Sequence, residues 1–443
     1  MKLCRLTLAL VAALTLPASA QPGGAEPLRL GLAEALARAE AASANLARLS
    51  ALERSALAQE DAAQAARKAE VGALASYTRR SNVPELVIAI PGSPPRTVFP
   101  NIPNNYRARV EGSIPLWTGG RLEAQLAAAG AGREAAGHRR TAGVNDLRAE
   151  VASAYWSLVT ARATEQVLGE ALAAYEAHRR DAENRRAVGM AAANEVLAVT
   201  VERQRAELAR IEAASGARLA AANLARLLGL TPGTEIEPGE ELAPPAAEPA
   251  DAEALVADAL GRRAERSVLA SRLAVLDSRV RAEKSRHKPQ VSLAAGLELG
   301  NPNRNILPPE EKWEDSWDVT VGLTWRLWDG GRTAAAVAEL EAEAEALRHE
   351  LADLDRRLGL EVLNRLEERA TAEATIALAE ANVEAARENR RVAAERYRAG
   401  VLASAELLDA EVALLSAGLD LTRARAARRL ADAGLERALG GPR

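Results

Sequence analysis

Two carboxylates near the C-terminus, Glu406 and Asp409, lie three residues apart in a run of strong helix formers. Residues i and i+3 of a helix share one face, so both carboxylates would be presented on the same side. Paired negative charge of this kind attracts cations. Taken alone, however, the pair is better interpreted as two solvated acids on a charged helix.

Other residue types that carry chemistry occur without the required spacing. No His-x-x-x-His pair exists and no Gly-x-Ser-x-Gly motif is present. Neither Gly119-Gly120 nor Gly330-Gly331 is followed by the Gly-Lys-Ser/Thr of a phosphate loop. The histidines are single and scattered: His138, His178, His287 and His349. The sequence therefore predicts no metal site, no cofactor and no enzymatic activity.

The elements that hold these residues occur twice, because the chain contains a long internal repeat with an offset of about 211 residues. Each copy has a stretch with strand periodicity, a double-glycine turn and a long helical stretch, in that order. Equivalent pairs include Tyr106 with Trp317, Trp117 with Trp328, Gly189 with Gly400, and Glu195 with Glu406.

Four segments alternate apolar and polar residues and are predicted as two strand pairs, 71–79 with 106–117 and 290–299 with 317–328. Alternation over about 11 residues suits a tilted strand that crosses a bilayer, although a half-buried strand of a soluble sandwich also alternates. Tryptophan favours the membrane, because five of the six lie around these strand pairs and resemble an interfacial girdle. They are Trp117, Trp313, Trp317, Trp325 and Trp328.

Long helices are predicted after each double glycine, over 121–186 and 332–397, followed by second helical runs over 195–228 and 406–439. About 66 residues at 1.5 Å each give a rod of roughly 100 Å, which must pack against others like a coiled coil. Gly189 and Gly400 are placed as helix C-caps between the runs. Single helices over 28–68 and 252–286 are expected to lead into the strand pairs.

The remaining features bound the class of protein. Residues 1–20 are a predicted signal peptide, 21–230 the first structural repeat, 231–251 a connector rich in proline and acids, and 252–443 the second repeat. The net charge of −4 gives no basic excess for nucleic acid. No apolar segment long enough for a membrane helix follows the signal. Four strands are too few to close a barrel, so several chains must contribute.

The chain resembles the TolC-type outer membrane efflux proteins (the outer membrane factor family). The resemblance rests on the duplication and on IPLWTGGR, WRLWDGGR, VASAYWSL, RRAVGMAAANEVL and ERYRAGVLASAELLDAE. It implies a mainly α-helical homotrimer with a β-barrel portion: a 12-stranded β-barrel in the outer membrane that continues as an α-barrel tunnel through the periplasm. It also implies a passive exit duct of a tripartite efflux or type I secretion system. Its partners would be a periplasmic adaptor, an inner-membrane pump and outer membrane lipid.

The resemblance also implies residue roles at the periplasmic entrance. Glu406 and Asp409 match an acidic ring, and the gate would include Tyr397, Asn194 and Glu195. Adaptor contacts would lie at the helical turns, at Gly189, Met190, Gly400, Val401 and Leu402. One departure is Leu402, which replaces an arginine that links neighbouring hairpins in some members. The competing class is a periplasmic coiled-coil structural or adaptor protein, in which one helical hairpin is flanked by soluble β domains.

Overall fold

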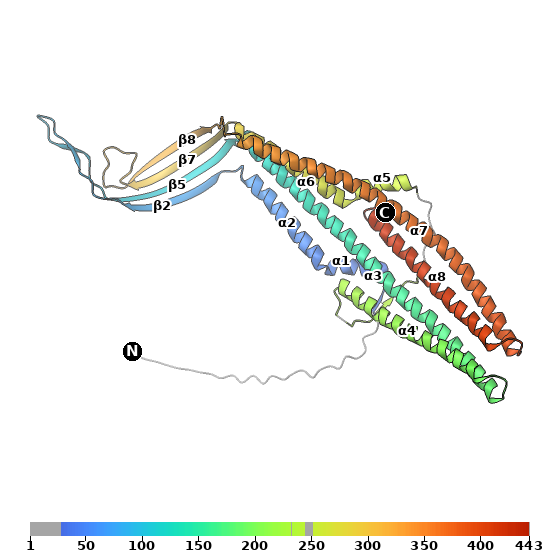
Figure 1. Ribbon diagram of the computed structural model, residues 1–443. Coiled ribbons are helices and arrows are strands. Elements are labelled where there is room, and N and C mark those ends of the chain that lie inside the picture. Colours follow the sequence, from blue (N-terminus) through green and yellow to red (C-terminus); the bar gives the residue numbers. More distant parts are fainter. Residues whose placement is uncertain (1–27, 232, 244–250, 443) are drawn as a thin grey trace, which may run out of the picture.

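The protein is elongated, with a curved β-sheet at one end that continues into a bundle of long helices (Figure 1). The computed structural model describes residues 28–231, 233–243 and 251–442. The predicted signal peptide at 1–20 and part of the predicted connector at 231–251 lie outside the described residues. Within the described chain, no helix is both long and apolar enough to cross a membrane.

The sheet has four antiparallel strands in the order β2-β5-β7-β8, namely β2 (Glu70–Arg79), β5 (Asn104–Trp117), β7 (Gln290–Asn301) and β8 (Glu314–Thr324). The central pair, β5 and β7, joins the two copies of the repeat. Strands β2 and β8 are its outer strands, and each has one unpaired edge within a single chain.

The strand predicted over 317–328 is Glu314–Thr324 in the structure. The predicted end was therefore wrong by four residues. The last ladder pair joins Gln290 to Thr324, and the preceding residue of the partner segment is Pro289. Proline has no N–H, so it cannot continue the ladder. Trp325 instead donates its indole N–H to the carbonyl of His287 at 2.9 Å.

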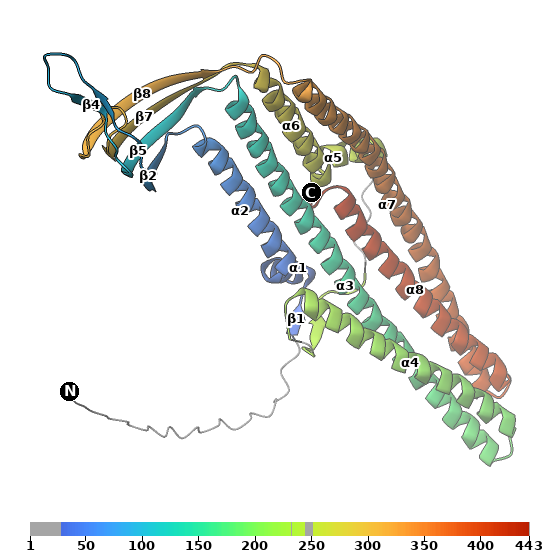
Figure 2. The same ribbon diagram turned by 60° about the vertical axis from the view of Figure 1, so that its left-hand side comes forward.

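The segment between β2 and β5 contains a small hairpin of β3 (Leu86–Ile88) and β4 (Arg96–Phe99). It projects from the end of the sheet that is farthest from the helices (Figure 2).

Two helices of 67 residues, α3 (Arg121–Ala187) and α7 (Arg332–Arg398), run the length of the helical part. At 1.5 Å per residue each is about 100 Å long. Each begins after two glycines with positive φ, a left-handed conformation that glycine adopts without strain. They return as α4 (Ala193–Leu227) and α8 (Ser404–Ala438), so each copy ends in a helical hairpin (Figure 1).

The single helices expected over 28–68 and 252–286 are each broken. The first is β1 (Leu28–Leu30), α1 (Leu32–Ala42) and α2 (Ala44–Ala65), and the second is α5 (Ala252–Arg262), α6 (Ala264–Lys284) and the 3₁₀ turn η1 (Ser285–His287).

The breaks lie at Ser43 and Arg263, both with extended backbone. The Ser43 hydroxyl accepts from Leu46 N–H at 3.2 Å as an N-cap of α2. Arg263 donates to the carbonyls of Arg437 and Ala438, both at 3.2 Å, which satisfies the C-terminal end of α8. Each break therefore allows a side chain to cap the end of a helix, which helix propensity alone does not predict.

The main apolar core lies at the middle of the helical part. Val151, Tyr155 and Leu158 of α3 are completely buried there together with Leu224 of α4. Strand β6 (Ile236–Pro238), in the described part of the connector, pairs in parallel with β1 and buries Ile236 in the same cluster. Each fully buried large apolar side chain of this kind contributes about 1.5–3 kcal/mol.

Candidate functional site

The sheet has one apolar face and one polar face, as strand alternation requires. In the register of the four strands, Val110 lies opposite Leu297, and Leu297 lies opposite Trp317. Trp317 and Val321 are 75% and 67% exposed, so the helices do not cover this face. The apolar face comprises Val71, Ala73, Ala75, Tyr77, Tyr106, Ala108, Val110, Ile114, Leu293, Leu297, Leu299, Trp317, Val319, Val321 and Leu323.

The polar face carries what we call the charge belt: Arg107, Arg109, Glu111, Glu298 and Asp318. Arg107 pairs with Glu298 at 2.6 Å. Arg109 contacts three carboxylates, those of Asp318 at 2.7 Å, Glu111 at 3.0 Å and Glu298 at 3.5 Å. Each arginine of the belt is therefore neutralised by at least one acid on the same face.

The five tryptophans lie at the two ends of the sheet. Trp313 and Trp317 are at the loop end, where the rings of Tyr106 and Trp313 are 5.8 Å apart. Trp325 and Trp328 follow β8 at the helix end, and Trp117 closes β5 there.

A bulge places Trp117 on the apolar face. The β5–β7 register shifts between Pro115 and Trp117, so Trp117 lies opposite Val291 instead of continuing the polar side. The position of each tryptophan is compatible with a girdle at two interfaces.

The two helical hairpins end at the opposite pole of the molecule (Figure 2). Gly189 and Gly400 close the α3–α4 and α7–α8 turns with φ of 78° and 76°. Met190 and Val401, beside these glycines, are 72% and 67% exposed. Leu402 is half-buried and packs against the cluster that contains Tyr397. The turns therefore expose isolated apolar side chains.

The predicted gate residues lie near these turns but in different environments. Glu406 and Asp409 are exposed on α8, and within the described chain neither forms an ion pair or a side-chain hydrogen bond. Asn194 is exposed at the start of α4. Glu195 is partly buried, and its carboxylate accepts from Ala192 N–H at 3.2 Å as part of a capping box.

Tyr397, by contrast, is buried and links the two hairpins. The Arg185 guanidinium of α3 lies 4.1 Å from the centre of the Tyr397 ring and donates to the Tyr397 carbonyl at 2.6 Å. The His178 ring packs edge-on against the same tyrosine at 5.2 Å. Burial raises the pKa of the Tyr397 hydroxyl, so it remains protonated at neutral pH.

A buried polar group beside Tyr397 was missed by the sequence analysis. His178 of α3 is joined to Glu411 of α8 at 2.9 Å (Nδ1 to Oε2) and to the Ser404 hydroxyl at 3.0 Å. The side chains of His178 and Glu411 are 1% and 4% exposed. Burial of the neighbouring Tyr175 hydroxyl, together with the negative charge of Glu411, raises the pKa of Tyr175 to about 12.

A sequence signal for this group does exist. His178 follows buried Tyr175 by three residues and precedes buried Ala182 by four, so it lies on the buried stripe of α3. The prediction tested histidines only for metal spacing and therefore overlooked it.

A second cluster links α3 to α4. Glu176 accepts hydrogen bonds from Arg179 at 2.9 Å, Arg180 at 3.2 Å and, from α4, Arg203 at 3.0 Å. The bonds from Arg179 and then Arg180 outweigh desolvation and lower the pKa of the Glu176 carboxyl to about 2. The carboxylate is therefore ionised over the whole physiological range.

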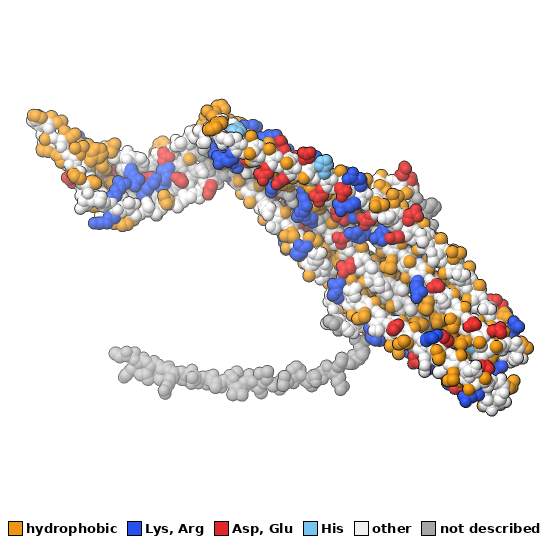
Figure 3. Space-filling view, in the orientation of Figure 1, with side chains coloured by type: hydrophobic (Ala, Val, Ile, Leu, Met, Phe, Trp, Pro, Cys, Tyr) orange, Lys and Arg blue, Asp and Glu red, His pale blue; other side chains and the backbone are white. Residues whose placement is uncertain are grey.

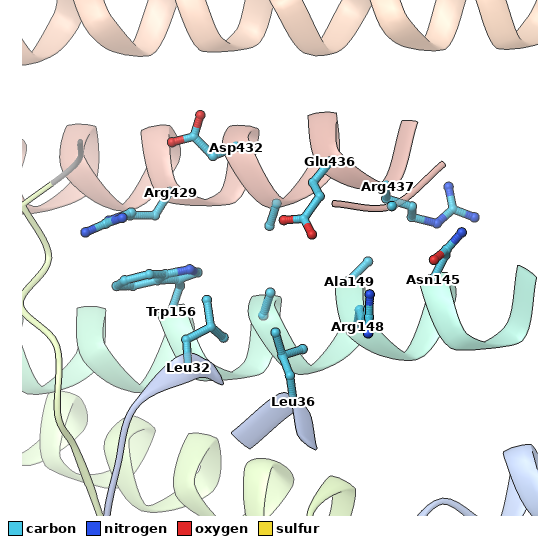
Figure 4. A pocket seen from close by; sticks show the side chains of 13 residues that line it. Leu32, Leu36, Asn145, Arg148, Ala149, Trp156, Arg429, Asp432, Glu436 and Arg437 are labelled. Carbon is cyan, nitrogen blue, oxygen red and sulfur yellow. The ribbon is translucent and has the colours of Figure 1, made fainter. Parts of the chain in front are cut away.

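A cavity of about 210 Å³ lies between α1, α3 and α8 (Figure 4). Arg429 stacks on the ring of Trp156 at 4.2 Å. The other two arginines that line the cavity form ion pairs: Arg148 with Glu40 at 2.6 Å, and Arg437 with Asp146 at 2.8 Å. The cavity is therefore a packing feature of the core region.

Comparisons with known proteins agree with this architecture. The family model described as outer membrane efflux protein matches residues 35–230 and 255–441. Protein CyaE of Bordetella pertussis is 31% identical over 171 residues, which make up 38% of this chain and only 35% of CyaE.

Solved structures share the fold. The outer membrane protein VceC of Vibrio cholerae is 21% identical, with a TM-score of 0.76 over 93% of this chain and 96% of VceC. CusC is 17% identical, with a TM-score of 0.75 over 98% of this chain and 99% of that chain. The open MtrE outer membrane channel of Neisseria gonorrhoeae is 19% identical, with a TM-score of 0.75 over 93% of this chain and 89% of MtrE.

Two long helical hairpins attached to a two-faced sheet define an outer membrane channel protein rather than an enzyme. The chain belongs to the outer membrane efflux protein family, as the matching motifs of its two repeats predict. Its location is the outer membrane of the Gram-negative cell envelope.

Proposed function

We propose that the chain is one subunit of a homotrimeric exit duct that serves a tripartite efflux or type I secretion system. The observation that carries this proposal is the two-faced sheet with an open edge on both β2 and β8. Pairing β8 of one copy with β2 of the next would satisfy both edges. With four strands from each chain, three copies give 12 strands, which is within the range of membrane barrels.

In this barrel the apolar face would contact outer membrane lipid and the polar face would line the lumen. Trp317 and Trp325 are eight residues apart, about 26 Å along the strand at 3.3 Å per residue. At a strand tilt of about 40° this spans about 20 Å of the apolar band, which is about 25 Å tall in such barrels. The aromatic groups at both ends of the sheet would then lie at the two membrane interfaces.

The helical hairpins would form the tunnel and its periplasmic entrance. Three copies of Glu406 and Asp409 would surround the axis with unpaired carboxylates and favour cations there. The turns with exposed Met190 and Val401 are the proposed contacts for a periplasmic adaptor, which connects the duct to an inner-membrane pump. The chain itself would supply no energy for transport.

The competing proposal, a periplasmic coiled-coil or adaptor protein, leaves the apolar face of the sheet without a partner. A soluble protein rarely exposes a contiguous apolar patch of this kind to water.

Extraction and oligomeric state test the proposal. The mature protein should require detergent for extraction, give the mass of three chains by native mass spectrometry, and form ion-conducting pores in a planar bilayer. A monomer that is released in buffer alone and gives no conductance would instead support the periplasmic alternative.

A further inference from the structure

A second charged feature lies where the sheet meets the helices. We call it the basic cavity: about 320 Å³ lined by Arg121, Arg286, Lys288, Gln290, Thr324 and Arg326. Basic side chains are visible at this junction in the space-filling view (Figure 3). The four cations come from the start of α3, from η1, from the link between η1 and β7, and from the chain after β8.

The backbone brings these segments together closely. Gly119 approaches the link after η1 so tightly that a Cβ at this position would lie 2.6 Å from Lys288 Cβ. Its φ of +67° also favours glycine. The beginning of α3 with Arg121 is thereby held against Lys288, although like charges repel when they converge on one cavity.

Within the described chain, the acids of the junction neutralise one of these four cations. Glu283 pairs with Arg286 at 3.0 Å. Asp329 instead caps α7, where its carboxylate accepts from Gly331 N–H at 3.2 Å and from Thr333 N–H at 3.0 Å.

Among the residues that the structure describes, three of the four cations therefore have no carboxylate partner. Arg121 bonds to the amide of Gln125 at 3.4 Å, and within the described chain Lys288 and Arg326 have no side-chain partner. The charge belt on the same sheet is the opposite case, because both of its arginines contact carboxylates.

The cavity opens on the polar face. Gln290 and Thr324 are the last ladder pair of β7 and β8, two residues beyond Ser292 and Gly322 on that face. They place polar side chains at the floor of the cavity.

We propose that the basic cavity is a binding site for oxyanions: phosphate, sulfate or carboxylate groups of solutes in the duct. Guanidinium groups form paired hydrogen bonds to such groups, and a lysine adds a mobile point charge. The placement of the cavity in the lumen rests on the proposed function, whereas the convergence of the four cations does not.

The test measures block of the conducting trimer by inorganic tripolyphosphate in a planar bilayer of zwitterionic lipid. Tripolyphosphate should reduce the conductance of the native channel in a saturable way. In Lys288→Gln with Arg326→Gln the concentration for half-block should rise about tenfold or more, because two charge-assisted contacts are lost. Arg304→Gln, which alters an arginine in the loop at the far end of the sheet, is the matched control and should leave block unchanged.

The outcomes are distinguishable. Conductance with equal block in the native and double-variant channels overturns the anion site but leaves the exit duct intact. If instead the native channel is insensitive to tripolyphosphate and binds anionic lipid more tightly than the double variant in native mass spectrometry, the site faces lipid headgroups and its lumenal assignment is wrong. Absence of any conductance from the native protein contradicts the proposed function itself.

Discussion

Arg109 on β5 donates two hydrogen bonds to Asp318 on β8, although β7 lies between the two strands. The distances are 2.7 Å from Nη1 to Oδ1 and 3.1 Å from Nη2 to Oδ2. The guanidinium crosses β7 at Gly296, where an added Cβ would lie 2.2 Å from Nη2 and 2.5 Å from Cζ. Gly296 therefore allows the arginine to lie flat on the polar face and to join three strands.

Replacing Gly296 by alanine should displace the Arg109 guanidinium and break this link between β5 and β8. The guanidinium is the mobile end of a flexible side chain, so the cost is mainly that of the lost ion pair, and the protein should unfold at a slightly lower temperature. The measurement is the loss of the folded, heat-modifiable species on semi-native gels. Gly72→Ala on β2 is the control, because a Cβ there meets nothing within 4 Å. If Gly296→Ala and Gly72→Ala unfold at the same temperature, the contact of Arg109 with Asp318 across β7 does not contribute to stability.

The buried pair of His178 and Glu411 should hold α8 against α3 near the helical turns. Replacing His178 by alanine removes the hydrogen bond to the buried Glu411 carboxylate and leaves it only the longer ion pair with Arg390 at 3.8 Å, so the change should cost about 1–3 kcal/mol. Hydrogen exchange should therefore increase in the α7–α8 hairpin. The double variant His178→Ala with Glu411→Ala should recover part of the lost protection, because the buried charge is removed as well.

Thr200, which occupies the position of Glu411 in the first copy of the repeat, provides the control for that experiment. Its hydroxyl donates to the Val196 carbonyl of its own helix at 2.7 Å. Thr200→Ala should therefore change exchange little. If hydrogen exchange in α8 of the His178→Ala protein equals that of the native protein, the pair of His178 and Glu411 does not hold α8 against α3.

Acid should weaken the ion-pair cluster around Glu176, where Arg179 and Arg180 of α3 lower the pKa of the carboxyl and Arg203 of α4 also donates to it. The folded-state pKa is lowered from 4.5 to about 2, so the stabilisation is fully present above about pH 4.5 and is lost as the pH falls toward 2. Glu176→Gln should be less stable than the native protein at pH 7 and similar to it at pH 2. Thermal unfolding across this range checks the effect, with exposed Glu212→Gln of α4 as the control. A constant difference between Glu176→Gln and the native protein at all pH values would contradict the assignment.

Periodicity predicted the duplicated strand and helix elements well because each depends on local patterns. The start of α7 was expected at residue 332 and lies at Arg332, since two glycines of positive φ separate strand and helix periods. The breaks at Ser43 and Arg263 were missed, because Arg263 is held by carbonyls at the end of α8 that lie about 170 residues away along the chain. The parallel pairing of β1 with β6 was likewise invisible to local patterns.

The candidate sites divide in the same way. The tryptophans and the exposed acids could be found from residue type and position. The charge belt and the basic cavity could not, because each combines residues from both copies of the repeat, such as Arg109 with Asp318 and Arg121 with Arg326. Their existence depends on the register of β5 with β7, which only the three-dimensional structure specifies.

Tryptophan fluorescence should separate membrane-facing from buried rings. In a variant that retains only Trp317, which is 75% exposed, brominated lipids should quench the emission strongly. A variant that retains only Trp156, 3% exposed in the helical core, is the control and should be quenched little. Equal quenching in the two variants would exclude Trp317 from the lipid interface.

The carboxylates of Glu406 and Asp409 should influence ion flow at the entrance, because neither is neutralised within the described chain. Glu406→Ala with Asp409→Ala should lower the preference of the channel for cations over anions by about twofold or more, measured from the reversal potential in a salt gradient. Block by divalent cations from the periplasmic side should weaken as well. The control is Glu339→Ala with Glu343→Ala, two exposed acids of α7 near the sheet end of the helical part. If selectivity and block change in the control but not in the Glu406 and Asp409 variant, the narrow charged point of the duct is not at the helical turns.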